Sequence, residues 1–264
     1  MITGTEGSAV FINNIRHGTT SASGELALPR VWAGSYPVRI RTVGYADFHG
    51  VITVRSGEER TLKIKQSPTH DEATIHYQRG EAFRDARKDE DAVREFQEAI
   101  RLYHGLTPAR IGLARVLIAQ EQFEEAETQL SAAIRAGGAF AVEATTVLAN
   151  LRRSQGLYDE SIVAYKRALL LGNGISPEAH IGLAIALEEK NDLASAVRHY
   201  RLGIGQDMDT EPILYYLLGK ALEKNGDSNQ AIEAYQGYLR LDPDGQYSSA
   251  VASIIQQLKQ EPQQ

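Results

Sequence analysis

The feature that most constrains this fold is a repeat of about 35 residues in the C-terminal three quarters of the chain. A small residue recurs at that spacing, a large apolar residue follows it by four positions, and another small residue precedes it by twelve. The three series are Ala92, Ala126, Ser161, Ala196 and Ala231; Phe96, Leu130, Tyr165, Tyr200 and Tyr235; and Gly80, Ala114, Ala149, Ala184 and Gly219. Small residues let two helices approach closely, and a large side chain one turn away fills the space beside them. The pattern therefore predicts five helical hairpins that bury their apolar faces by stacking.

The boundaries of the hairpins follow from proline and from the end of the pattern. Pro108, Pro177 and Pro212 suit the first turn of a helix, where a missing N–H costs nothing. The repeats are predicted to fill residues 72–245 and to begin near Ala73, Thr107, Val142, Pro177 and Pro212. After them, Tyr247 to Lys259 carries apolar residues on one face, which predicts a capping helix within residues 246–264.

The first 66 residues differ in both charge and texture. They contain eight Lys/Arg and five Asp/Glu, a balance of +3, whereas the rest of the chain, with twenty and twenty-nine, has −9. Short apolar stretches predict strands at Ala9–Ile12, Leu26–Leu28, Tyr36–Val43, Val51–Val54 and Thr61–Lys65. In the third of these, alternation places Tyr36, Val38 and Ile40 on one face, inward, and Arg39 and Arg41 on the other, outward. Residues 1–66 should form a small antiparallel β-sandwich, joined to the repeats by a linker at residues 67–71 and packed against them.

This β region resembles a known family. Ala33 to Ile40, then Gly44-Tyr45, then Val51 to Val54 with Gly57, are similar to the PEGA domain. The name-giving Pro-Glu-Gly-Ala is absent, and residues 30–34 read Arg-Val-Trp-Ala-Gly instead. The resemblance implies a prealbumin-like sandwich without catalysis, and it favours a place outside the cytoplasm in a bacterial cell envelope.

The repeats, from Ala73 to about Asp244, resemble tetratricopeptide repeats (TPR). The resemblance implies an all-α superhelix after the β-sandwich, and a concave groove lined by the first helix of each hairpin. A partner protein, as a peptide or a helical segment, would bind there. The groove positions of the five repeats are Tyr77, Glu81 and Arg84; Ile111, Arg115 and Ile118; Thr146, Asn150 and Arg153; Ile181, Ile185 and Glu188; and Tyr216, Lys220 and Glu223.

Two properties of the groove positions are expected. Their apolar members should form an exposed strip, and Arg115 and Arg153 should meet near Asn150 to form one cationic patch. A patch beside an apolar strip suits a partner segment that carries carboxylates next to apolar anchors. The alternative is a structural component of the cell envelope, in which the β domain anchors and the repeat array is a spacer.

Other function classes find little support in the sequence. The chain has no cysteine, no glycine-rich phosphate loop and scattered histidines, so no catalytic residue, cofactor or metal is expected. Asp207 to Glu211 is acidic, but it lacks the spacing of a calcium loop and is predicted to connect two helices. A net charge of −6 argues against nucleic-acid binding. No apolar run reaches the ~18 residues of a membrane span, and Met1 to Val10 does not read as a leader peptide. Compartment and oligomeric state stay open.

Overall fold

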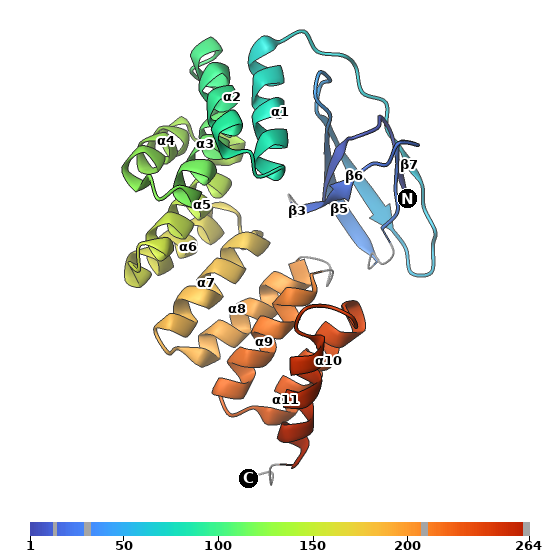
Figure 1. Ribbon diagram of the computed structural model, residues 1–264, viewed down its shortest axis with the longest axis vertical. Coiled ribbons are helices and arrows are strands. Elements are labelled where there is room, and N and C mark those ends of the chain that lie inside the picture. Colours follow the sequence, from blue (N-terminus) through green and yellow to red (C-terminus); the bar gives the residue numbers. More distant parts are fainter. Residues whose placement is uncertain (13–14, 29–32, 207–210, 261–264) are drawn as a thin grey trace. The chain divides into compact units, whose positions relative to one another are not determined.

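The computed structural model describes residues 1–12, 15–28, 33–206 and 211–260. The chain forms two compact units, Met1–Val147 and Leu148–Gln264 (Figure 1). The Arg-Val-Trp part of the PEGA-like motif, residues 30–32, and the acidic residues 207–210 lie outside the described ranges.

The first unit begins with two β-sheets. The larger has the order β3-β2-β5-β6, from strands β2 (Ala9–Ile12), β3 (Ile15–Thr19), β5 (Gly34–Arg41) and β6 (Phe48–Val54), and all its pairs are antiparallel. In β2 and β5, Val10 lies opposite Ile40 and Ile12 opposite Val38, and all four side chains are buried. The inward position predicted for Val38 and Ile40 is therefore confirmed, while Tyr36 is half-buried.

The smaller sheet has the order β4-β1-β7 and departs from the antiparallel prediction. Its strands are β1 (Ile2–Thr3), β4 (Glu25–Leu26) and β7 (Leu62–Lys63), and β1 pairs with β7 in parallel. Antiparallel direction follows from a short connecting turn, whereas these two strands begin and end the β domain and no turn joins them. Two strands were not predicted from the sequence: β1, which has only two residues, and β3, whose residues Ile-Arg-His-Gly-Thr show no apolar alternation.

Helices of the first unit follow the β domain. They are α1 (Glu72–Asp85), α2 (Asp89–Leu102), α3 (Thr107–Ala119), α4 (Phe123–Ala136) and the start of α5 (Ala141–Ser154), which a 3-10 turn at Gly138–Phe140 precedes. Asp71 caps α1 by accepting a hydrogen bond from the Thr74 amide at 3.1 Å, which satisfies one of the free N–H groups of the first turn.

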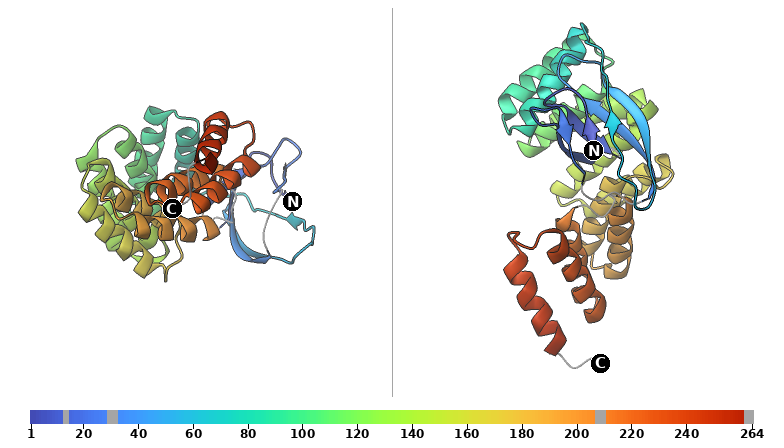
Figure 2. Two further views of the ribbon diagram at one scale, coloured as in Figure 1. Left: turned by 90° about the horizontal axis from the view of Figure 1, so that it is seen from below. Right: turned by 90° about the vertical axis from the view of Figure 1, so that its right-hand side faces the viewer.

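The second unit continues the hairpins. It contains α6 (Tyr158–Leu171), α7 (Pro177–Glu189), α8 (Leu193–Gln206), α9 (Pro212–Lys224), α10 (Ser228–Leu241) and α11 (Ser248–Gln260), and α11 packs beside α10 (Figure 2). The described residues thus hold eleven α-helices, and the first helices of the hairpins begin at or within one residue of the predicted repeat starts. None of these helices is long and apolar enough to cross a membrane.

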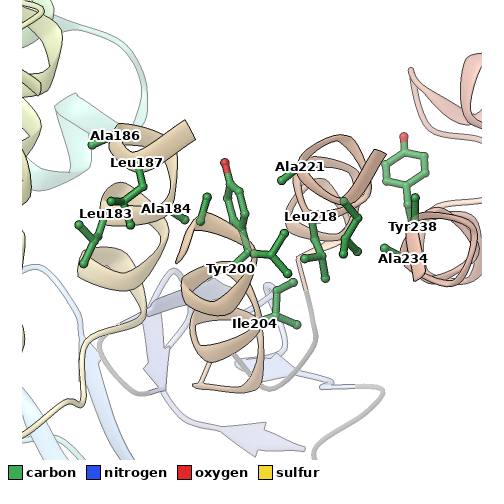
Figure 3. Packing of buried hydrophobic residues seen from close by; sticks show 14 of the residues in the cluster. Leu183, Ala184, Ala186, Leu187, Tyr200, Ile204, Leu218, Ala221, Ala234 and Tyr238 are labelled. Atoms are coloured by element: carbon green, nitrogen blue, oxygen red, sulfur yellow. The ribbon is translucent and has the colours of Figure 1, made fainter. Parts of the chain in front are cut away.

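The recurring small and large residues have the role that their spacing predicts. Figure 3 shows Tyr200 of α8 between Leu183 and Ala184 of α7 and Leu218 and Ala221 of α9, all of them buried.

Glycine carries the closest approaches between repeats. A Cβ on Gly80 or Gly112 would lie only 2.7 or 2.5 Å from the ring of Phe96, so this ring sits between a glycine of its own repeat and one of the next. Gly182 approaches Tyr165 in the same way.

Candidate binding face of the repeat array

The first repeat offers little of its predicted groove, because the β domain uses those positions. Arg41 of β5 was expected to point to solvent, and this prediction is wrong: its side chain is 5% exposed. Its Nη1 lies 2.8 Å from Oε2 of Glu81 and donates a hydrogen bond to the Tyr77 hydroxyl at 2.7 Å. Tyr77 and Glu81 are correspondingly buried, so the expectation that they are exposed is also wrong. Because α1 covers this end of β5, the arginine needs a carboxylate beside it.

Further contacts fix this place. Gln78 of α1 donates from Nε2 to the Tyr45 carbonyl at 2.8 Å and accepts from the Gly44 amide at 2.9 Å. We call the contacts of Arg41, Tyr77, Gln78 and Glu81 across these elements the β5–α1 joint. Burial raises the pKa of the Tyr77 phenol well above its usual range, so its hydroxyl stays neutral. Arg84, the third groove position, reaches Glu81 at 2.7 Å and remains 27% exposed.

The groove positions that follow in the first unit are also partly closed. Ile111 and Thr146 are buried, at 2% and 1% exposure, so the predicted apolar strip is not exposed at Ile111. The Thr146 hydroxyl donates to the Val142 carbonyl within its own helix. Ile118 and Arg115 are half-buried, and Arg115 lies 3.4 Å from Glu143. Helix packing of each repeat on the next explains this burial, since a position that faces the groove in one repeat also borders its neighbour.

In the second unit, tyrosine hydroxyls hold the polar groove positions. Tyr165 donates to Oδ1 of Asn150, and its oxygen accepts from Nε of Arg153 at 3.4 Å. Tyr200 donates to Glu188 at 3.0 Å, and Tyr235 donates to Glu223 at 2.7 Å. These tyrosines are the large residues of the repeat, so their rings fill the core while their hydroxyls reach the first-helix face. The sequence contains a pattern that could have predicted these hydrogen bonds: a charged residue stands twelve positions before each tyrosine, namely Arg153, Glu188 and Glu223.

Hydrogen bonds between neighbouring repeats also hold polar groove side chains in place. The Asn150 amide nitrogen donates to Glu178 at 2.9 Å, and the Lys224 ammonium donates to Glu188 at 2.6 Å. Glu188 is therefore neutralised, while Arg153 and Lys220 supply positive charge to the face. Arg115 belongs to the first unit and Arg153 to the second, so a patch that joins them stays a prediction.

The apolar groove positions of the second unit are half-buried at Ile181, Ile185 and Tyr216. Ile181 covers Gly203 of α8: a Cβ added to Gly203 would lie only 2.4 Å from Cδ1 of Ile181. The Tyr216 ring stacks on Tyr247 with centroids 4.5 Å apart, and the Lys220 ammonium lies 5.7 Å from the Tyr216 centroid. Sequence reasoning missed Tyr247, because it lies outside the repeat.

One polar pair in the second unit is unrelated to the groove. Nδ1 of His180 and Nδ1 of His199 are 2.9 Å apart, and the rings stack at 5.2 Å. Burial, followed by the neighbouring His180 and Arg198, lowers the pKa of His199 to about 4. Burial also lowers the pKa of His180. Both rings are therefore neutral at pH 7, and one must donate to the other.

Comparison with known proteins agrees with these observations. The tetratricopeptide repeat family matches residues 111–177, 146–211 and 213–244, and the PEGA domain matches residues 2–69. No curated protein matches the chain. Solved structures show the same fold: a chain of the APC/C hetero-tetramer Cut9–Hcn1 has 18% identity and a TM-score of 0.62, over 72% of this chain and 37% of its own. Tom70 of yeast has 18% identity and a TM-score of 0.60, over 72% of this chain and 40% of its own. PilF of Pseudomonas aeruginosa has 15% identity and a TM-score of 0.57, over 71% of this chain and 90% of its own.

Proteins with these repeats are generally non-catalytic scaffolds that bind other proteins or peptides, and PEGA domains are found in extracytoplasmic proteins. With helical hairpins that follow two small β-sheets along the chain, this protein belongs to the tetratricopeptide repeat proteins and carries an N-terminal PEGA domain.

Proposed function

We propose that the chain is a scaffold that binds an extended or helical segment of another protein on the first-helix face of repeats 3 to 5. The residues that bind are Asn150, Arg153, Ile181, Ile185, Glu188, Tyr216, Lys220 and Glu223. The observation that carries the proposal is the row of tyrosine hydroxyls from Tyr165, Tyr200 and Tyr235, which hold polar groove side chains in place.

Such positioning favours binding for an energetic reason. A long side chain that becomes ordered only on binding costs about 0.5–1.5 kcal/mol of conformational entropy. Arg153, Glu188 and Glu223 are already hydrogen-bonded to rings that are themselves fixed in the core, so part of that cost is met by folding.

The chemistry of the face favours one kind of segment. Lys224 neutralises Glu188, so Arg153 and Lys220 outnumber Glu223, the remaining carboxylate among these binding residues, and can attract carboxylates. Ile181, Ile185 and the Tyr216 ring offer half-buried apolar surface beside them. A segment with Asp or Glu next to Leu, Ile or Phe fits this arrangement.

Selection from a displayed library of random peptides against the full chain tests the proposal. Selected peptides should combine acidic and large apolar residues, and Arg153→Glu with Lys220→Glu should weaken their binding at least tenfold, about 1.4 kcal/mol. Arg240→Glu on α10 is the matched control, because Arg240 is equally charged, exposed and on a second helix. Arg115→Glu, measured alone, tells whether the first unit takes part. Equal binding by the double variant would refute the proposal.

The PEGA domain favours an extracytoplasmic location for this scaffold. The β5–α1 joint ties that domain to the first repeat through buried contacts, so an anchor in the β domain would also hold the first repeat. Fractionation of cells that express the full-length protein would test the location.

A further inference from the structure

Helix α6 of the second unit carries large apolar side chains that are exposed. Val163 and Leu170 of α6 are 68% and 79% exposed. The buried side of α6 consists of Ser161, Tyr165 and Ala168. At 100° per residue, Val163 and Leu170 point directly away from that side, two turns apart. Two exposed apolar side chains aligned in a stripe on one helix face form the centre of a candidate contact surface.

Charges flank this stripe in a self-complementary order. Asp159 and Glu160 lie one turn before Val163, and Lys166 and Arg167 lie one turn after it. Helical geometry places Asp159 and Lys166 on one flank of the stripe and Glu160 and Arg167 on the other. The carboxylates are 80% and 61% exposed on their side chains, and both basic residues are exposed.

We propose that two copies of this chain associate through α6, in an antiparallel pair with its two-fold axis at Val163. Two identical antiparallel helices bring the same flank of each copy together. Asp159 of each copy then faces Lys166 of the other, and Glu160 faces Arg167. Val163 meets its own equivalent, and Leu170 lies opposite Gly156, just before the helix begins. Each contact is made twice, as a two-fold interface requires.

The charge pattern favours a second copy of this chain, in antiparallel orientation, over other partners. A parallel pair would set acids beside acids and bases beside bases, which is repulsive. An unrelated partner would not need opposite charges at equal distances from one central residue. The intramolecular pairs Asp159–Lys190, at 3.0 Å, and Glu160–Arg152, at 3.4 Å, do not compete strongly, because exposed ion pairs contribute little.

The dimer should be weak. α6 has 14 residues, so the contact is about 21 Å long, which is small for a permanent interface. Self-association should therefore depend on protein concentration, and on salt as well, since four ion pairs contribute.

Sedimentation equilibrium of the full chain tests the proposal with two complementary variants. One is Asp159→Lys with Glu160→Lys, and the other is Lys166→Glu with Arg167→Glu. Each variant alone faces like charges in the proposed dimer and should raise the dissociation constant at least tenfold. A mixture of the two restores every opposite-charge contact and should form a heterodimer. Arg240→Glu on α10 is the control and should associate like the wild type.

A second measurement uses the absence of native cysteine. Val163→Cys places a thiol on the proposed axis, so mild oxidation should yield a disulfide-linked dimer, whereas Leu202→Cys on α8 should yield far less. If a charge variant fails to fold, as circular dichroism would show, Val163→Glu replaces it, because that side chain is exposed. A wild-type chain that stays monomeric at high concentration overturns the proposal. So do charge variants that dimerise like the wild type, and a mixture that does not re-form the dimer.

Discussion

Replacing Arg41 or Glu81 by leucine measures how strongly the β domain is tied to the repeats. Both side chains are under 10% exposed and meet at 2.8 Å. Removing one member of a buried ion pair typically costs about 3–5 kcal/mol, because the other charge is left buried without its partner.

The two substitutions should differ within that range. Arg41→Leu leaves Glu81 with Arg84 at 2.7 Å, so its cost should lie near the lower end, about 3 kcal/mol. Glu81→Leu removes the carboxylate that contacts Arg41 and leaves it the Tyr77 hydroxyl, the rings of Phe11 and Tyr77, and the charges of Asp47 and Asp85, so its cost should exceed that of Arg41→Leu and reach up to about 5 kcal/mol. The double substitution should cost less than the sum, because no unpaired charge remains from the pair.

Hydrogen exchange of the β5 and α1 amides is the assay. Where exchange requires opening of the first unit, a loss of about 3 kcal/mol should speed it about hundredfold. Arg94→Leu is the control, because its ion pair with Asp91 is exposed and should contribute under about 1 kcal/mol. If the single variants exchange no faster than this control, or if their effects simply add, the joint does not couple the two parts and the reasoning fails.

Two further predictions concern the second unit. Ala149→Leu and Gly182→Ala should each lower stability by roughly 1–3 kcal/mol, because Ala149 is fully buried and a Cβ at Gly182 would lie 2.4 Å from the Tyr165 ring; unchanged denaturation midpoints would contradict this close packing. The free energy of unfolding should fall as pH drops from 6.5 towards 4, because His180 and His199 have lowered pKa values in the folded chain and take up protons on unfolding. Each proton taken up contributes a slope of no more than about 1.4 kcal/mol per pH unit. His199→Phe should flatten that slope, and an unaltered slope in denaturation at several pH values would show that the pair is not responsible.

Local patterns in the sequence were enough to predict the repeats. A small residue such as Ala184 and a large one such as Tyr200 are constrained by contact within one hairpin or with the next, so the constraint recurs at a fixed spacing. The inward position of Val38 and Ile40 in β5 was predictable too, because successive side chains of a strand point to opposite faces.

Contacts between distant parts of the chain were not predictable in this way. Arg41 and Tyr77 are 36 residues apart, and nothing in either neighbourhood shows that α1 covers the end of β5. The parallel pairing of β1 with β7 depends on the whole β domain between them. Ile111 and Thr146 were predicted to be exposed in the groove, but both are buried. Burial at such a position depends on the side chains of the neighbouring repeat, and counting positions within one repeat takes no account of them.

The glycine contacts of the fold have a mechanical consequence. Gly112 and Gly182 let the second and fourth repeats press against the aromatic ring of the repeat before them, so these pairs of repeats are stiff. The corresponding position of the fifth repeat is Leu217, so no glycine of that repeat lies against the ring of Tyr200 there. Under tension, repeats 3 and 4 should therefore move as one block, while the fifth repeat swings against them. That swing would change the span between Ile185 and Lys220, so the array would act as a spring whose extension alters the length of segment it can grip.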